Sequence, residues 1–181
     1  MNNTFEIKEH QKEIVNKINE LNKKNLYYFT IQQNKRTRPF TYDELKKHID
    51  GGIKKSIKDY HGINYIEKFH KEILNKTLSF VTIFETSKEF FWSQNDINNL
   101  SEDVFMGLHF HLFISTNQSS GIYIPQVINN IIDKFNKQTN KYKAIKKVDY
   151  NKIKELDNNF MYYHTKQGMF HNNISMIHSN V

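Results

Sequence analysis

The chain has 181 residues, a net charge of +7 at pH 7, an aromatic content of 14% and no cysteine. This length suits one domain with a substantial core, and the lack of cysteine excludes disulfides, thiolate metal sites and a cysteine nucleophile. The basic charge indicates an anionic partner such as nucleic acid, or only a lysine-rich solvated surface. No apolar run reaches the ~20 residues of a membrane helix. Residues 1–25 are too charged for a signal peptide, so we expect a cytoplasmic protein without a membrane partner.

The first half of the chain predicts a helix, a strand and a second helix, in that order. Apolar residues at helical spacing among charges predict a helix over 4–24, which either packs against the domain or makes a dimer contact. The run LYYFTIQ predicts a strand over 26–32. Thr41 and Glu44 then form a capping box, which predicts a helix over 41–60 with a Gly-Gly pair as a potential interruption.

The second half of the chain predicts three strands, at 78–86, 108–115 and 141–148, and two helices, at 124–137 and 151–167. The resulting order is typical of a ferredoxin-like α+β fold, an antiparallel sheet with helices on one face. The other face of such a sheet is open, and a site can be built there. We divide the chain into an N-terminal helix at 1–25, a main domain at 26–170 and a C-terminal tail at 171–181.

Two histidines interrupt the otherwise apolar strand LHFHLFIS. Because side chains alternate along a strand, His109 and His111 share one face, while Phe110 and Leu112 point to the other and belong against the helices. The two imidazoles therefore lie side by side on the open face. They can bind one cation there, or they can be ordinary surface histidines.

A carboxylate at the end of the preceding strand can supply a third ligand. Glu85 ends an apolar run, and a half-buried carboxylate needs a partner such as a cation. If the two strands pair antiparallel, Glu85 lies near the histidines; otherwise it faces water, and Glu89, Glu102 or Asp103 can take its place. Two imidazoles and a carboxylate do not select one metal, because Mg²⁺ or Mn²⁺ suits a phosphate substrate and zinc is the alternative.

The last predicted helix contains the sequence YYHTKQ. Tyr163 and Lys166 are three residues apart and share a helix face. A tyrosine hydroxyl can attack a phosphodiester that a metal polarises, and a nearby lysine can neutralise the charge that develops. The alternative is that the tyrosines are core and Lys166 is surface. Tyr162 competes as nucleophile, but adjacent helical residues point about 100° apart, and the lysine spacing favours Tyr163.

Three motifs in this order resemble the HUH endonuclease superfamily, specifically the nuclease domains of rolling-circle replication initiators (Rep). FTIQ at 29–32 is similar to the FTxQ strand of that family. HFH at 109–111 is similar to its His-hydrophobic-His strand, which has an acidic ligand upstream, and YHTK at 163–166 to its Tyr-x-x-Lys helix. The resemblance spans 26–167, and no phosphate-binding loop of a helicase accompanies it.

The resemblance implies an HUH nuclease fold and a metal-dependent tyrosine endonuclease that nicks and rejoins single-stranded DNA. Tyr163 would form a covalent 5′-phosphotyrosine link with Lys166 beside it, and His109, His111 and Glu85 would hold Mn²⁺ or Mg²⁺. The substrate would be single-stranded DNA or an origin hairpin of a plasmid or virus. A host helicase and polymerase would be partners in the replication that follows. A relaxase or single-tyrosine transposase would use the same chemistry, and a non-catalytic DNA-binding module or a structural zinc protein are further alternatives.

Contacts to DNA are expected beside the first strand. We expect Arg36 and Arg38, in the basic turn, and Gln32 to bind DNA; the alternative for the arginines is a solvated turn. Aromatic residues of the open sheet face, such as Tyr28 or Phe113, are candidates for stacking on bases, although packing in a core is the commoner role.

Overall fold

The computed structural model describes residues 9–34, 40, 42–62, 70–85, 109–117, 121–137, 145–153, 156–165, 170–171, 174–175 and 177–181. Its helices are α1 (Glu9–Asn19), the 3₁₀ turn η1 (Lys23–Asn25), α2 (Tyr42–His61), α3 (His70–Thr77), α6 (Ile124–Asn136) and α7 (Asn158–Thr165). Its strands are β1 (Leu26–Gln33), β2 (Leu78–Glu85), β3 (His109–Thr116), β4 (Ile145–Lys152), β5 (Phe170–His171), β6 (Ile174–Ser175) and β7 (Ile177–Ser179).

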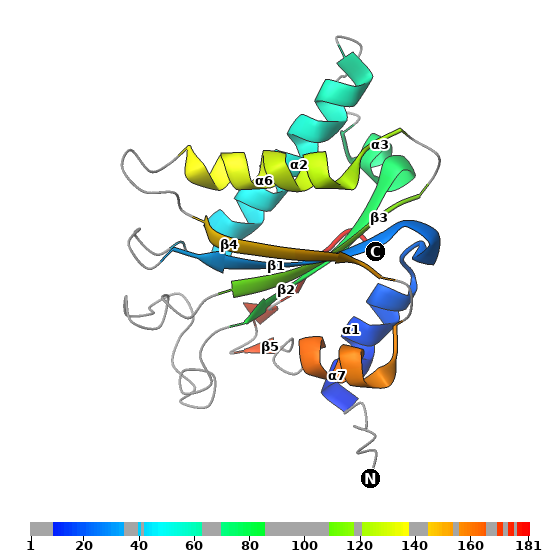
Figure 1. The fold of residues 1–181 in the computed structure, drawn as a ribbon. Coiled ribbons are helices and arrows are strands. Elements are labelled where there is room, and N and C mark those ends of the chain that lie inside the picture. The colour runs from blue at the N-terminus through cyan, green and yellow to red at the C-terminus, as the bar shows by residue number, and fades with distance from the viewer. Residues whose placement is uncertain are drawn as a thin grey trace.

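Five of these strands form an antiparallel sheet in the order β4-β1-β3-β2-β7 (Figure 1). Strand β3 lies between β1 and β2, and β1 lies between β3 and β4. The first four strands with α2 and α6 therefore make two interleaved βαβ units, which is the ferredoxin-like arrangement. The α+β fold with an antiparallel sheet, predicted from the order of elements, is confirmed.

Helices cover both faces of this sheet rather than one (Figure 1). On the first face, α2 and α6 bury the apolar side chains that alternation assigned to them, among them Phe110, Leu112 and Ile114. On the second face, α1 and α7 pack over the members of a second core cluster, which includes Tyr28, Val81, Ile83, Phe113 and Ile14. The expectation of an open second face is wrong at these positions, because their apolar side chains need cover as well.

The second helix is continuous through its Gly-Gly pair, contrary to the interruption considered from the sequence. A Cβ on Gly52 would overlap the backbone of Ile131 in α6. Gly52 is therefore present because α2 and α6 pack backbone to backbone at that point. The capping residue proposed for this helix, Thr41, lies outside the described residues.

The C-terminal part of the chain differs most from the sequence-based boundaries. Strand β4 continues to Lys152, where it pairs with Tyr27 of β1, so the last helix begins at Asn158 rather than at residue 151. Earlier in the chain, helix α3 (His70–Thr77) was not predicted. The tail at 171–181 supplies β7, which pairs with β2 at the edge of the sheet. Cross-strand pairing of this kind depends on distant partners, and local periodicity does not encode it.

Candidate metal site

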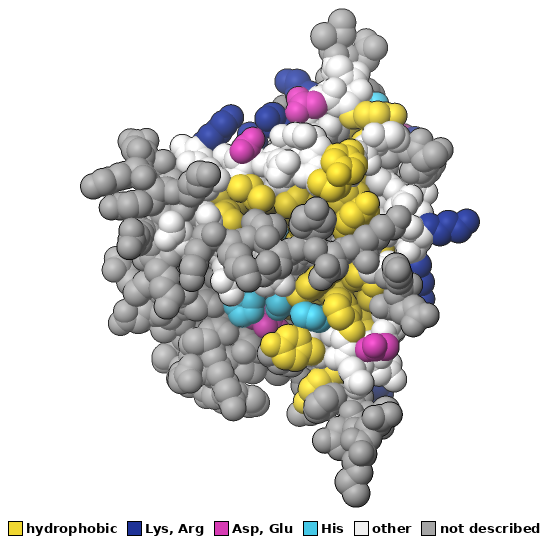
Figure 2. All heavy atoms as spheres, in the orientation of Figure 1, with side chains coloured by type: hydrophobic (Ala, Val, Ile, Leu, Met, Phe, Trp, Pro, Cys, Tyr) yellow, Lys and Arg dark blue, Asp and Glu magenta, His cyan; other side chains and the backbone are white. Residues whose placement is uncertain are grey.

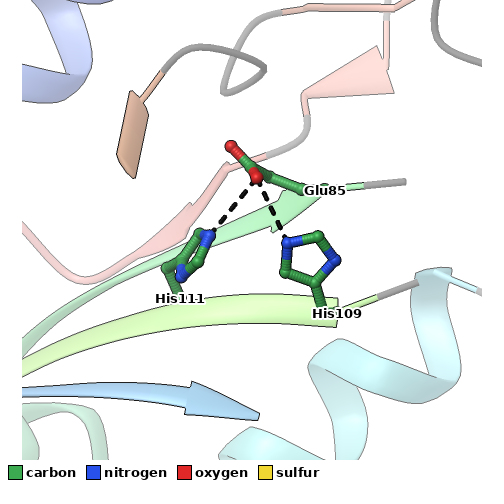
Figure 3. Close-up of side chains that lie close together, drawn as sticks. All are labelled: Glu85, His109 and His111. Carbon is green, nitrogen blue, oxygen red and sulfur yellow. Dashed lines mark hydrogen bonds and ion pairs between the residues drawn. The ribbon is translucent and has the colours of Figure 1, made fainter. Parts of the chain in front are cut away.

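The site begins with the register of β2 and β3. The two strands pair antiparallel, and Glu85 lies directly opposite His109. His111 is two residues farther along β3 and points to the same face. Glu85 Oε2 lies 3.2 Å from Nε2 of His109 and 3.3 Å from Nε2 of His111 (Figure 3). The antiparallel pairing on which the choice of Glu85 depended is thus present, and these three residues could hold a metal ion.

Most of this cluster is buried. Glu85 is 1% exposed and His111 is 4% exposed, whereas the side chain of His109 keeps 25% of its exposure. Figure 2 shows histidine side chains at the surface beside an acidic one, with hydrophobic side chains next to them. The cluster is therefore accessible from the side of His109, where β3 begins.

The electrostatics of the cluster favour an ionised carboxylate. Burial raises the pKa of Glu85. The hydrogen bonds and charges of His109 and His111 lower it by more than burial raises it, so that the pKa falls to about 2. Oxygen Oε1 of Glu85 is buried and has no hydrogen-bond partner among the described residues. An unpartnered buried carboxylate oxygen is costly, and a divalent cation would satisfy it.

The donor set fits a divalent metal but does not choose one. Two imidazole nitrogens and one carboxylate suit Mn²⁺ or Zn²⁺. Three protein ligands would also leave positions for water and phosphate oxygens, as Mg²⁺ and Mn²⁺ sites commonly do.

A tyrosine hydroxyl extends the cluster on its inner side. The hydroxyl oxygen of Tyr28 lies 2.6 Å from Nδ1 of His111, 2.7 Å from Nδ1 of His164 and 2.7 Å from Oγ1 of Thr30. The sequence did not predict a role in the metal site for Tyr28, Thr30 or His164; Tyr28 was considered only for stacking on bases. A signal was available for Thr30, which shares a strand face with Tyr28, but only the β1–β3 register places Thr30 opposite His111.

Helix α7 lies against the same sheet face and carries the two candidate nucleophiles. The ring of His164 is centred 5.0 Å from that of His111, and the ring of Tyr163 is centred 5.0 Å from that of His164. Tyr163 is 59% exposed, while Tyr162 is half-buried. Of the two tyrosines, Tyr163 therefore presents more of its side chain to a ligand in solution.

The N-terminal helix holds α7 in place from the other side. Gln11 is fully buried, and its amide nitrogen donates to the carbonyl oxygen of Tyr162 at 3.1 Å and to Oγ1 of Thr165 at 2.9 Å. Of the two roles considered for the first helix, packing against the domain is the one that α1 has in the structure.

The other predicted site residues divide into three groups. Gln32 is exposed and lies opposite His109 in the ladder of β1 and β3, so its side chain borders the cluster. Tyr28 and Phe113 are buried in the second core cluster, which excludes base stacking by either. The remaining candidates lie outside the described residues: Arg36, Arg38, Lys166, Glu89, Glu102 and Asp103.

In the part of the chain that the structure describes, no helix is both long and apolar enough to cross a membrane. Comparison of the chain with family models, curated proteins and solved structures finds no match.

Proposed function

We propose that this chain is a metal-dependent endonuclease of the HUH type, which nicks and rejoins single-stranded DNA through a covalent tyrosine intermediate and so starts rolling-circle replication. One observation carries the proposal. The Glu85–His109–His111 cluster and the helix that presents Tyr163 lie on the same face of the sheet and are joined through His164. A metal ligand set beside an exposed tyrosine is the minimum that such chemistry requires.

In the proposed reaction, the hydroxyl oxygen of Tyr163 attacks the phosphorus of one phosphodiester. A bond forms between tyrosine oxygen and phosphorus, and the bond from phosphorus to the 3′ oxygen breaks. The phenolic proton ends on that oxygen, which leaves a free 3′-hydroxyl and a 5′-phosphotyrosine. A metal held by the cluster would act as a Lewis acid on the scissile phosphate. Attack of a 3′-hydroxyl on the phosphotyrosine reverses the step and joins strands.

The charge of the chain and one residue beside the cluster support a nucleic-acid substrate. The net charge is +7, and Lys/Arg contacts to phosphates are the main source of affinity for DNA. Gln32 borders the cluster and can contact the nucleotide next to the scissile phosphate. We propose the same for Arg36 and Arg38, which follow β1 in the chain, and a phosphate contact for Lys166. The substrate would be an origin strand or hairpin of a plasmid or virus, acted on next by a host helicase and polymerase.

The test is the formation of a covalent adduct. The protein is incubated with Mn²⁺ and a pool of single-stranded oligonucleotides that have a randomised centre and a label at the 3′ end. Cleavage leaves the 3′-labelled piece on the protein, so a labelled band should appear at protein size on a denaturing gel. Sequencing the trapped DNA then identifies the nick site, because the randomised centre contains every short candidate sequence.

Matched variants of the two tyrosines decide the nucleophile. Tyr163→Phe should abolish the adduct, and Tyr162→Phe should retain it. An adduct that persists in Tyr163→Phe but is lost in Tyr162→Phe would show that the nucleophile is misassigned. Absence of an adduct with the whole pool would favour a DNA-binding module without catalysis. Transfer of a bound strand only to conjugative-origin or element-end sequences would favour a relaxase or transposase.

The role of the metal is tested separately from DNA binding. His111→Ala removes one ligand, and EDTA removes the ion. Both should abolish the adduct and leave binding of the same oligonucleotides, measured by fluorescence anisotropy, within about twofold, because phosphate contacts provide most of the affinity. Cleavage that survives in EDTA would refute the metal role.

A further inference from the structure

The hydroxyl of Tyr28 is in contact with both halves of the proposed site. We propose that Tyr28 is a positioning residue: its hydroxyl orients His111 for metal binding and ties helix α7, through His164, to the metal cluster. The inference rests on the metal site of the proposed function. It assigns roles to Tyr28 and His164, neither of which belongs to the His-x-His or Tyr-x-x-Lys pattern of metal ligands and nucleophile.

The orienting role follows from the two nitrogens of His111. Nε2 faces Glu85 at 3.3 Å and is the atom that would bind a metal, so it must present a lone pair. The ring proton then sits on Nδ1, which lies 2.6 Å from the oxygen of Tyr28. A metal-binding histidine typically donates its other N–H to an oxygen, and this contact fixes the tautomer and the ring orientation.

With the proton of His111 on Nδ1, each contact of the Tyr28 hydroxyl can be assigned one donor and one acceptor. A phenol has one proton to donate and lone pairs to accept. The oxygen accepts from Nδ1 of His111 and from the hydroxyl of Thr30, and the single proton is donated to Nδ1 of His164. In this arrangement the Tyr28 oxygen makes the shortest contact to Nδ1 of His111, with Oγ1 of Thr30 farther away at 3.3 Å, and it also holds His164.

Packing holds the Tyr28 hydroxyl where these contacts require it. Tyr28 is 6% exposed, and its ring stacks on His111 at a centroid distance of 5.6 Å. Phe113 packs against the ring at 5.0 Å and Phe160 of α7 at 5.2 Å. A phenylalanine at this position would keep all three ring contacts and lose only the oxygen, so Tyr28→Phe isolates the proposed role.

The second role concerns the placement of α7. This short helix is held by Gln11 on the side of α1 and by Tyr28 on the side of the sheet. Tyr163 lies between Tyr162, whose carbonyl oxygen Gln11 holds, and His164, which Tyr28 holds. Loss of the contact between Tyr28 and His164 therefore leaves the nucleophile anchored on one side only, and a small misplacement of a reacting group is costly in rate.

The first measurement is Mn²⁺ affinity of the full chain without DNA, by calorimetric titration. Tyr28→Phe should weaken Mn²⁺ binding by about 10- to 100-fold, the usual effect of removing an oxygen that supports a ligating histidine. Tyr27→Phe is the matched control, because Tyr27 lies on the same strand and packs on the opposite sheet face. Its Mn²⁺ affinity should stay within about twofold of wild type.

The second measurement is the rate of adduct formation against Mn²⁺ concentration. Tyr28→Phe should raise the half-saturating Mn²⁺ concentration and lower the maximal rate. His164→Phe keeps a ring at that position and leaves the Tyr28–His111 contact, so it should lower the maximal rate while the Mn²⁺ affinity stays within about twofold. A loss that reflects only poorer folding would lower the melting temperature of these variants and would not separate the two parameters in this way.

The outcomes distinguish the inference from the function on which it rests. If the wild type binds Mn²⁺ and Tyr28→Phe binds it equally tightly, the orienting role is overturned and the metal site stands. An unchanged maximal rate in His164→Phe would overturn the link to α7. If Mn²⁺ binding weakens in Tyr28→Phe although no DNA adduct ever forms, the positioning role of Tyr28 is supported and the nuclease proposal fails. If the wild type binds no Mn²⁺, both proposals fall.

Discussion

Replacing Glu85 with glutamine should change how the metal-free protein responds to acid. The pKa of this carboxyl is lowered from 4.5 to about 2: burial acts to raise it, but the hydrogen bonds from the two histidines outweigh burial. The folded protein therefore binds this proton more weakly than the unfolded chain does. The resulting stabilisation is complete above the unfolded pKa and is lost as the pH falls from 4.5 through 2.

The size of the effect follows from the same pKa values. They differ by about 2.5, and one pKa unit corresponds to ~1.36 kcal/mol, so the ionised carboxylate contributes about 3 kcal/mol to the free energy of unfolding above about pH 5. Glutamine at this position does not titrate. The difference in unfolding free energy between wild type and Glu85→Gln should therefore shrink by about 3 kcal/mol on acidification.

The assay is urea denaturation in EDTA from about pH 6 to about pH 2.5, a range that covers most of the expected loss. Glu72→Gln is the matched control, because the exposed Glu72 pairs with Lys76 at 2.6 Å on the surface. This control should keep the acid sensitivity of the wild type, since exposed ion pairs contribute little. If the difference in unfolding free energy between wild type and Glu85→Gln stays constant across the pH range, the Glu85 carboxylate does not contribute this stability.

Three further predictions concern the metal and the packing. Mn²⁺ at 100 times its dissociation constant should raise the unfolding free energy by about 2.7 kcal/mol, measured by thermal denaturation, and a variant without one of the three ligands should show no gain. Gly52→Ala should destabilise the protein by about 1–3 kcal/mol in urea denaturation, because its Cβ would overlap Ile131, whereas Gly51→Ala meets only ordinary contacts and should be neutral or stabilising by up to about 1 kcal/mol. Equal effects would contradict this account of the α2–α6 contact. Gln11→Ala should cost about 1–3 kcal/mol because it removes two hydrogen bonds between α1 and α7, and an unchanged midpoint would show that α1 does not anchor that helix.

Several features of the site follow from local sequence alone. Alternation along β3 assigned the histidines and the apolar residues to opposite faces, and the core cluster under α2 and α6 confirms it. The direction of each side chain in a strand is a local property of the backbone, so a single sequence is enough to assign it. The spacing of helical and strand-like segments was likewise enough to predict an α+β fold with an antiparallel sheet.

Other features depend on residues far apart in the chain. Antiparallel pairing was a condition for choosing Glu85, and the register that sets it opposite His109 emerged only in the folded sheet. The sequence did not show that helices cover the second face of the sheet. The two helices that cover it, α1 and α7, come from opposite ends of the chain, and local periodicity does not show where a helix docks. The same is true of Gln11, whose partners in α7 are more than 150 residues away.

Local sequence shows which residue types are available for chemistry and which way they point within each element. It placed two histidines on one strand face, a carboxylate at the end of another strand and paired tyrosines on a helix. Which of them meet becomes visible only in the folded chain, where the Tyr28 hydroxyl also lies between His111 and His164. The division has one physical reason: periodicity encodes direction within an element, whereas register and helix docking are set by burial summed over the whole chain.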